Sequence, residues 1–319
     1  MAPLPRLAPC LPLALALAAC RPAPPPLPDV RVFATVSEAG AKALATTAAA
    51  RGVARVTLVA GGPAAADLAW LGDPSEAVEA AADLVAGAGP SQPGIAARWK
   101  DPGGRFVPLC ARARVLVVAP RAGIAPRPEA LRDLADRRLA GRQALAPLSH
   151  GLGPATAAAL ALVYGEPGIR AFLDLVAKNR PRIAGSDDEV RVLVAGGAAA
   201  FGLTGSEEAA AGAVSAAALE VVYPDQRGSG TVILPTAVAL TKAGAGSEPA
   251  RRLLAWMADE EAERLLAARA PGYLPLRAGV PVPLGARPAD NVRSPELDWD
   301  RLAMAKRRLA KYLESWPAP

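Results

Sequence analysis

Two short aliphatic runs, about a hundred residues apart, constrain the fold most. One is Arg114–Val118, which ends at Ala119 and Pro120, and the other is Val232–Leu240, which is interrupted by Pro235. Because proline cannot donate a ladder hydrogen bond, we predict that the second run leaves one sheet and enters another at Pro235. Two such crossing strands are what a two-lobed protein needs if its second lobe is inserted into its first. A binding cleft would then lie between the lobes.

The rest of the chain alternates short apolar strands with helices, which predicts an α/β fold in which each lobe is a mostly parallel sheet covered by helices. Hydrophobic residues make up 52% of the chain and aromatic residues 4%, so Ala, Val and Leu must build the core. We expect lobe 1 to be discontinuous, with residues 30–113 and 234–319, and lobe 2 to comprise residues 114–233.

Local patterns predict several helices and one surface segment. Ser37 and Ser75 are good N-caps for helices at 38–51 and 75–86. Residues 249–268 read as one long amphipathic helix, and residues 271–288 as a Pro-rich surface segment. A final amphipathic helix at 298–314 is expected to pack across both lobes.

The amino terminus resembles a lipoprotein signal peptide. A positive start is followed by the apolar stretch Leu7–Leu17, and small residues directly precede Cys20. The resemblance implies cleavage before Cys20, lipidation of its sulfur, and a periplasmic or cell-envelope location. Residues 21–29 would form a Pro-rich tether. An ordinary cleavable signal followed by a chance cysteine is the alternative. Cys110 would be the single cysteine of the rest of the chain, and its neighbours predict a buried position.

The charge pattern argues against nucleic acid as a partner. The formal net charge is +6, but the basic residues are scattered among acidic ones and form no stripe with interleaved aromatic residues. We expect a solvated surface and a monomer.

The order of several motifs resembles the extracellular solute-binding proteins of ABC importers, and most closely their ferric-ion-binding type. The resemblance rests on five strings, which are Arg105–Val118, Leu131–Arg142, Phe201–Thr204, Tyr223–Gln226 and Ile233–Leu240. It implies two lobes that close on a ligand and deliver it to a membrane permease. Ligand-contact positions of the family fall on Thr35–Ser37, Trp70–Asp73, Leu148–Thr156 and Thr204–Glu208.

The sequence departs from that family at the position where ferric-binding members carry adjacent tyrosines. Phenolates are hard, anionic oxygen donors that suit Fe(III), but this chain has Thr204-Gly205-Ser206-Glu207-Glu208 there. Its four tyrosines, Tyr164, Tyr223, Tyr273 and Tyr312, do not form that pair. The stretch from Val59 to Asp67 is also shorter than is usual in the family.

Three acidic residues are candidates for metal binding. Glu207 and Glu208, together with Asp73 from across the cleft, could supply oxygen donors to a hard cation or a cationic solute. The alternative is that Ser206 caps a helix whose dipole the two glutamates complement.

Other candidates are less specific. His150, the single histidine, could coordinate a metal or, with Ser149 and the start of the following helix, hold an anion; a surface histidine without a ligand is the alternative. Trp70 could shape the cleft wall or belong to the core. Asp225 and Gln226 could line the cleft or form a plain turn.

These observations predict a lipid-anchored solute receptor of an ABC importer, with ferric iron or its chelate as the first ligand to consider, as cargo and not as a cofactor. An organic or oxyanionic solute, or a cell-envelope scaffold or sensor that has lost transport, are the alternatives. The chain has no Gly-x-Ser-x-Gly elbow, no P-loop and no Cys/His metal signature, so we do not expect an enzyme.

Overall fold

The computed structural model describes residues 26–120, 122–211, 219–282 and 287–316. In this part of the chain nine strands form one sheet in the order β2-β1-β3-β9-β4-β7-β5-β6, with β8 paired to β4. The strands are β1 (Asp29–Ala34), β2 (Arg55–Val59), β3 (Leu68–Leu71), β4 (Val107–Val118), β5 (Gln143–Leu145), β6 (Arg182–Ile183), β7 (Phe201–Gly205), β8 (Glu220–Val222) and β9 (Ile233–Leu240).

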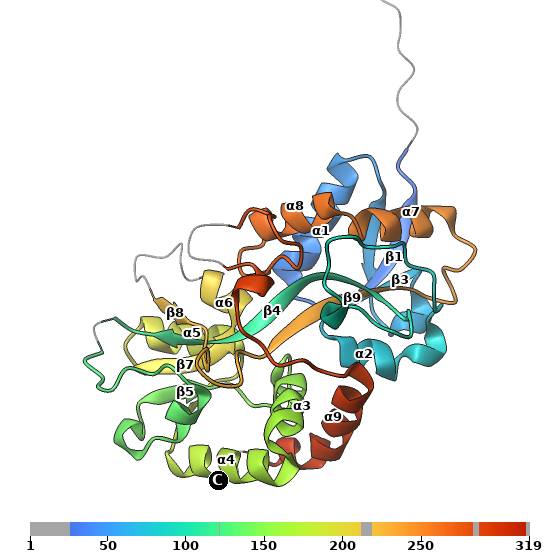
Figure 1. Ribbon diagram of the computed structural model, residues 1–319. Coiled ribbons are helices and arrows are strands. Elements are labelled where there is room, and N and C mark those ends of the chain that lie inside the picture. The colour runs from blue at the N-terminus through green and yellow to red at the C-terminus, as the bar shows by residue number, and fades with distance from the viewer. Residues whose placement is uncertain (1–25, 121, 212–218, 283–286, 317–319) are drawn as a thin grey trace, which may run out of the picture.

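Strand β4 joins the two halves of the molecule. Its first part, Val107–Ala113, pairs antiparallel with β9, and its second part, Arg114–Val118, pairs with β7 and β8. On one side, β1 to β3 form a mostly parallel group beside β9, and on the other side β5, β6 and β7 form a second parallel group. Figure 1 shows β4 and β9 running together between the two helix-covered halves. The expected two-lobed α/β fold is confirmed.

The predicted sheet change at Pro235 is wrong in detail, because it is β4 that changes partners. Strand β9 pairs continuously with β4 through Pro235, which lies opposite Ala111 where β4 has a bulge. Pro235 offers no N–H there. The backbone of Leu274 takes up the pairing of Ala111 instead, with N–O distances of 2.8 Å in both directions. This pairing holds the segment around residue 274 against β4.

The helices cover both faces of the sheet. They are α1 (Glu38–Ala50), α2 (Pro74–Glu79), α3 (Gly153–Tyr164), α4 (Glu166–Lys178), α5 (Asp187–Ala195), α6 (Ser206–Ala211), α7 (Glu248–Met257), α8 (Glu260–Arg269) and α9 (Trp299–Glu314).

Two predictions about these helices are wrong in detail. Residues 249–268 form two helices because Asp259 caps the second, and α2 is short and capped by Asp73, not by Ser75.

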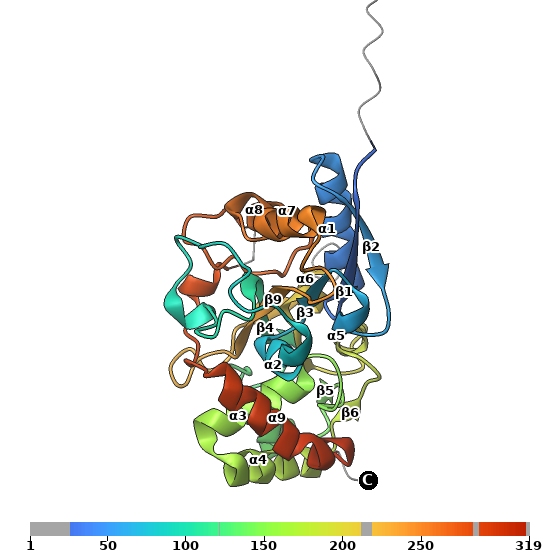
Figure 2. The same ribbon diagram turned by 90° about the vertical axis from the view of Figure 1, so that its right-hand side faces the viewer.

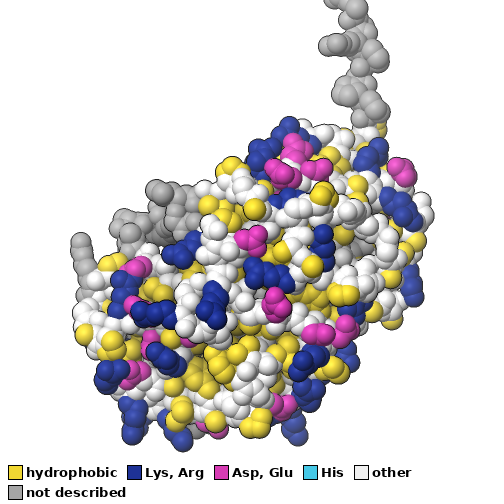
Figure 3. All heavy atoms as spheres, in the orientation of Figure 1, with side chains coloured by type: hydrophobic (Ala, Val, Ile, Leu, Met, Phe, Trp, Pro, Cys, Tyr) yellow, Lys and Arg dark blue, Asp and Glu magenta, His cyan; other side chains and the backbone are white. Residues whose placement is uncertain are grey.

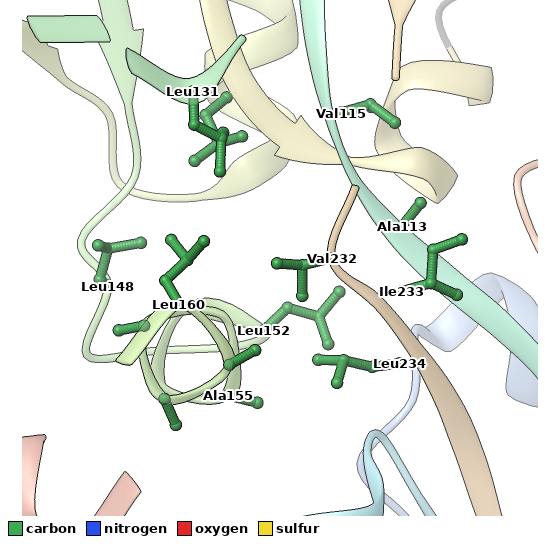
Figure 4. Packing of buried hydrophobic residues seen from close by; sticks show 14 of the residues in the cluster. Ala113, Val115, Leu131, Leu148, Leu152, Ala155, Leu160, Val232, Ile233 and Leu234 are labelled. Atoms are coloured by element: carbon green, nitrogen blue, oxygen red, sulfur yellow. The ribbon is translucent and has the colours of Figure 1, made fainter. Parts of the chain in front are cut away.

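Small and aliphatic side chains fill the core, as the composition predicts. Figure 4 shows Leu152, directly before α3, and Ala155 of α3 on the side of Val232 and Leu234, at the start of β9. Cys110 is fully buried, as expected, and burial raises the pKa of its thiol well above the usual range. The predicted surface position of residues 271–288 is wrong for Gly272–Arg277, which are buried because Leu274 pairs with β4.

Helix α9 packs against both halves, as predicted. Near its middle, Lys306 Nζ lies 2.9 Å from Glu79 Oε2 of α2, and further along Tyr312 donates a 2.8 Å hydrogen bond to Asp174 of α4. Figure 2 shows α9 lying along α3 with α2 above it.

The surface carries charges of both signs. In Figure 3 basic and acidic side chains alternate over the visible face, and no single-sign stripe is seen there. Among the helices that the structure describes, none combines the length and hydropathy needed to cross a bilayer. Cys20 and the predicted signal peptide lie outside the described residues.

Candidate functional site

The candidate site lies where β4 crosses between the halves, and its first wall is the turn that follows β3. Thr35, after β1, accepts a 2.7 Å hydrogen bond from Gly72 N and donates one to Glu76 Oε2. Burial, together with the neighbouring Asp73 carboxylate, raises the pKa of Glu76 to about 7. Glu76 is therefore an acid poised to change its charge near neutral pH.

Arg112 reaches this turn from the middle of β4. Its Nη2 atom donates a 2.7 Å hydrogen bond to the carbonyl of Gly72, and its Nη1 atom lies 3.1 Å from Glu207 Oε2. Residue 72 must be small, because a Cβ there would lie 2.6 Å from Nη2. The two charged side chains are 9% and 7% exposed, so this is a buried ion pair.

The ion pair is only partly satisfied. Arg112 Nε and Glu207 Oε1 are both buried, and neither finds a hydrogen-bond partner among the described residues. A buried donor or acceptor left unpaired costs roughly 1–3 kcal/mol. The pair thus keeps one donor and one acceptor that a bound solute could satisfy.

Tyr273 completes the cluster. Its hydroxyl lies 3.2 Å from Ser37 Oγ, and burial and the Glu207 carboxylate raise its pKa well above the usual range. We refer to Ser37, Gly72, Arg112, Glu207 and Tyr273 as the junction cluster. It combines oxygen donors with one guanidinium.

Helix α6 begins at this cluster. Ser206 Oγ donates to the carbonyl of Gly272 over 2.6 Å and accepts from Ala113 N over 3.0 Å, so it ties α6 to the neighbouring segments. Glu208 follows, and burial together with the Glu207 and Asp187 carboxylates raises its pKa to about 7. Glu208 is thus a second acid whose pKa lies near neutral pH.

A second arginine on the same face of β4 is paired with another acid, although its Nε atom is buried without a hydrogen-bond partner among the described residues. Arg114 forms a bidentate pair with Asp187 at the start of α5, with an Nη2–Oδ1 distance of 3.1 Å. Thr204 is completely buried, and its hydroxyl donates to the carbonyl of Asp187 over 2.8 Å. Thr204 therefore supports the start of α5 in this structure.

The predicted oxygen cluster of Asp73, Glu207 and Glu208 is not assembled in this conformation. The Asp73 carboxylate caps α2 by accepting a 2.8 Å hydrogen bond from Ser75 N, whereas Glu207 faces Arg112. Within the described ranges, no three or more His, Cys, Asp and Glu side chains are grouped so that they could hold a metal ion.

The remaining predicted residues lie elsewhere. Trp70 is fully buried, and its Nε1 donates to Thr236 over 3.0 Å. His150 is exposed, and its Nδ1 lies 3.0 Å from Ser149 Oγ. The side chain of Gln226 bonds Thr231 and both backbone groups of Arg293, so it stabilises a turn.

The start of α3 offers little to an anion. Gly153 N is already bonded to the carbonyl of His150, and the next residue, Pro154, has no N–H. Ala155 N is thus the one amide of the first three helical residues left for a ligand.

Sequence reasoning missed Arg112, Glu76 and Tyr273. Arg112 is one of two arginines in an otherwise apolar strand, and that pattern could have signalled partnered buried charges. Tyr273 carried no local signal, because its position depends on the pairing of Leu274 with Ala111.

The comparisons with known proteins agree with this architecture. The model of a family described as bacterial extracellular solute-binding protein matches residues 82–303. Comparison with curated proteins gave no match.

Three of the similar solved structures are informative. Apo ferric ion-binding protein A from Pasteurella haemolytica has 19% identity and a TM-score of 0.77, with 90% of this chain and 97% of that chain covered. IdiA (FutA) from Trichodesmium, in complex with iron and citrate ligands, has 19% identity and a TM-score of 0.74, with 90% and 98% covered. AfuA from Actinobacillus pleuropneumoniae, a periplasmic binding protein with fructose-6-phosphate bound, has 17% identity and a TM-score of 0.75, with 91% and 99% covered.

Proposed function

Because the chain belongs to the bacterial extracellular solute-binding proteins, we propose that it is the periplasmic substrate receptor of an ABC importer. The family consists of solute-binding proteins and not of catalysts. The receptor would capture its solute between the lobes and pass it to a permease. We propose residues 30–113 and 234–319 as one lobe and 114–233 as the other.

The ligand that the site supports best is ferric iron carried as a carboxylate chelate. The single observation that carries this choice is the buried Arg112–Glu207 pair, with one donor and one acceptor unsatisfied. A naked Fe(III) ion needs several anionic oxygen ligands, but Arg112 neutralises Glu207. A chelate brings its own carboxylates, which a guanidinium can bind while the protein oxygens approach the metal.

Closure of the lobes explains how such a ligand would be held. Ser37 and Gly72 belong to the first proposed lobe, Glu207 to the second, and Arg112 lies on the strand that joins them. A ligand that contacts both sides gains interactions in the closed state that the open state lacks, so binding shifts the population toward closure. The burial of Arg112, Glu207 and Tyr273 is consistent with a closed conformation.

A lipid anchor at Cys20 would hold the receptor at the membrane. The support is the sequence resemblance of the amino terminus to lipoprotein signal peptides. Two or more acyl chains suffice for stable anchoring. Palmitate labelling that persists in a Cys20→Ser variant would contradict this assignment.

An organic or oxyanionic solute is the second candidate. It is favoured by the likeness to the sugar-phosphate-bound AfuA fold and by the missing tyrosine pair. The guanidinium of Arg112 would bind the anionic group. The start of α3 near His150 is less suitable, because Gly153 N is already hydrogen-bonded and Pro154 has no N–H.

Calorimetry with Fe(III)-citrate, citrate alone and fructose-6-phosphate tests these alternatives. We expect binding of Fe(III)-citrate and at least tenfold weaker binding of the other two, which corresponds to about 1.4 kcal/mol. Tighter binding of fructose-6-phosphate would establish the second candidate. If no ligand binds and no small molecule accompanies the protein in native mass spectrometry, the chain is a scaffold or sensor.

A further inference from the structure

The first part of helix α9 is bonded to the half of the molecule that contains β1 to β3. Asp300 forms a bidentate pair with Arg105, directly before β4, with distances of 2.7 and 2.9 Å. One and a half turns further on, Lys306 Nζ lies 2.9 Å from Glu79 Oε2 of α2. These two ion pairs connect α9 to this half through exposed carboxylates, since the side chains of Asp300 and Glu79 are 61% and 31% exposed.

The last part of α9 is bonded to the other half. Arg308 Nε lies 3.2 Å from Glu166 Oε2 at the start of α4. Directly after the helix, Trp316 Nε1 donates a 3.0 Å hydrogen bond to the carbonyl of Leu173, in the same helix. The polar partners of α9 therefore change from one half to the other within two residues, between Lys306 and Arg308.

Helix α9 is a continuous rod across this change of partner. Its sixteen residues span about 24 Å and include no glycine or proline at which the helix would bend easily. Figure 2 shows it lying along α3 and touching α2. Because a rod bonded to both halves moves with only one of them, the halves can rotate apart only if one set of contacts is released.

The contacts on α2 lie directly behind the candidate site. Lys306 Nζ is 3.2 Å from Ser75 Oγ, and Ser75 is bonded to Asp73, the residue that caps α2. Gly72, one residue earlier, offers its carbonyl to Arg112. Helix α9 thus holds the end of α2 that carries one wall of the site.

We propose that α9 is a strap that holds the two halves in the closed arrangement and thereby determines how tightly the receptor binds its solute. The effect on affinity rests on the proposed function. When the strap is released, a smaller fraction of the molecules is closed, and the apparent Kd for a solute that binds the closed state rises in proportion.

Reversal of the two exposed carboxylates tests the strap. In the double variant Glu79→Arg/Asp300→Arg, each new guanidinium faces the cations that the carboxylate had paired with, so α9 is repelled from this half. The matched control is Arg55→Glu/Arg191→Glu, which reverses one pair within each half, with Asp29 in β1 and with Asp188 in α5.

The arrangement of the halves is measured without ligand, by pulsed electron paramagnetic resonance. Spin labels are attached to cysteines at the exposed positions Lys42 in α1 and Lys178 in α4, with Cys10 and Cys20 replaced by serine and Cys110 buried. We expect one distance population in the native chain and in the control, and a second population in Glu79→Arg/Asp300→Arg. Calorimetry with Fe(III)-citrate should give an affinity about fivefold weaker in that variant and unchanged in the control.

The other outcomes overturn the strap or separate it from the proposed function. A single native-like distance population in folded Glu79→Arg/Asp300→Arg, or a second population that appears equally in the control, would overturn the strap. If the reversal prevents folding, the milder Glu79→Gln/Asp300→Asn should show a smaller second population, and its absence there would also overturn the strap. If the reversal opens the halves while the native protein binds none of the tested solutes, the proposed function fails and the strap stands.

Discussion

Two buried arginine–glutamate pairs in this protein look alike by exposure but differ in how completely they are bonded. In the pair Arg277–Glu263 the side chains are 8% and 0% exposed, and in the pair Arg112–Glu207 they are 9% and 7% exposed. Glu263 accepts from Arg277 Nη1 over 2.7 Å and also from two backbone amides, while Arg277 donates to the carbonyls of Ala258 and Pro93. Arg112 Nε and Glu207 Oε1 have no hydrogen-bond partner in the part of the chain that the structure describes.

The difference separates a structural ion pair from a binding site. A buried pair contributes to a unique fold when every donor and acceptor is bonded. The pair at Arg277 meets that condition and packs against the first part of β4, beside Cys110. The junction cluster does not meet it, and it lies where β4 passes from one half of the sheet to the other. Unbonded polar atoms on both partners of a buried ion pair are thus the physical sign of the site.

The largest expected effect is at the fully bonded pair. Arg277→Met leaves the Glu263 carboxylate buried without its cation, which should lower the free energy of unfolding by about 3–5 kcal/mol. Urea denaturation measures this change. Ligand affinity of the folded fraction should stay unchanged, and a loss of affinity there would remove the contrast between the pairs.

Glu207→Gln should have a smaller effect on stability and a larger one on binding. We expect a loss of about 2 kcal/mol in the free energy of unfolding, because Arg112 keeps its bond to the Gly72 carbonyl. Affinity for Fe(III)-citrate should fall at least tenfold in calorimetry. Arg277→Met serves as the matched control, and a stability loss as large as in that variant would show that both pairs are structural.

The pH dependence of stability should reveal Glu76 beside the junction cluster. Its pKa rises from 4.5 to about 7 in the folded chain, because burial and Asp73 outweigh Thr35, Lys306 and Arg112. The stability it contributes is therefore fully present below pH 4.5 and is lost as pH rises through about 7.

Glu76→Gln should remove about 1–2 kcal/mol of this decline, since glutamine has no charge to bury. Urea denaturation of both proteins at pH 5 and pH 8 gives the comparison. Parallel stability curves for the two proteins would show that Glu76 is not protonated in the folded chain at pH 5.

The smallest effect is expected at the exposed pair Ser149–His150, which sets the baseline for both buried pairs. His150→Ala should change the free energy of unfolding by less than about 0.5 kcal/mol, because an exposed side chain loses little on truncation. Binding of Fe(III)-citrate should be unaffected. A large loss of affinity would indicate that the ligand binds at the start of α3 and not at the junction cluster.

Much of the fold could be predicted from local patterns. The aliphatic runs at 114–118 and 232–240 marked β4 and β9, and the period of 298–314 marked α9 as a helix that packs on both halves. The site was predicted less well. Ser37 and Glu207 do belong to the junction cluster, but Asp73 is a helix cap and Trp70 is buried in the core. A helix N-cap and a metal ligand both require a side-chain oxygen, so sequence alone cannot distinguish the two roles.

The sequence by itself determined which segments become strands and helices, because apolar periodicity and capping residues act over a few neighbours. Only the tertiary structure decided that Arg112, Glu207 and Tyr273 meet, since their contact depends on a bulge in β4 opposite a proline and on a distant segment that replaces the missing hydrogen bond. Such long-range pairing forms only when the whole sheet assembles, and no short stretch of the chain encodes it.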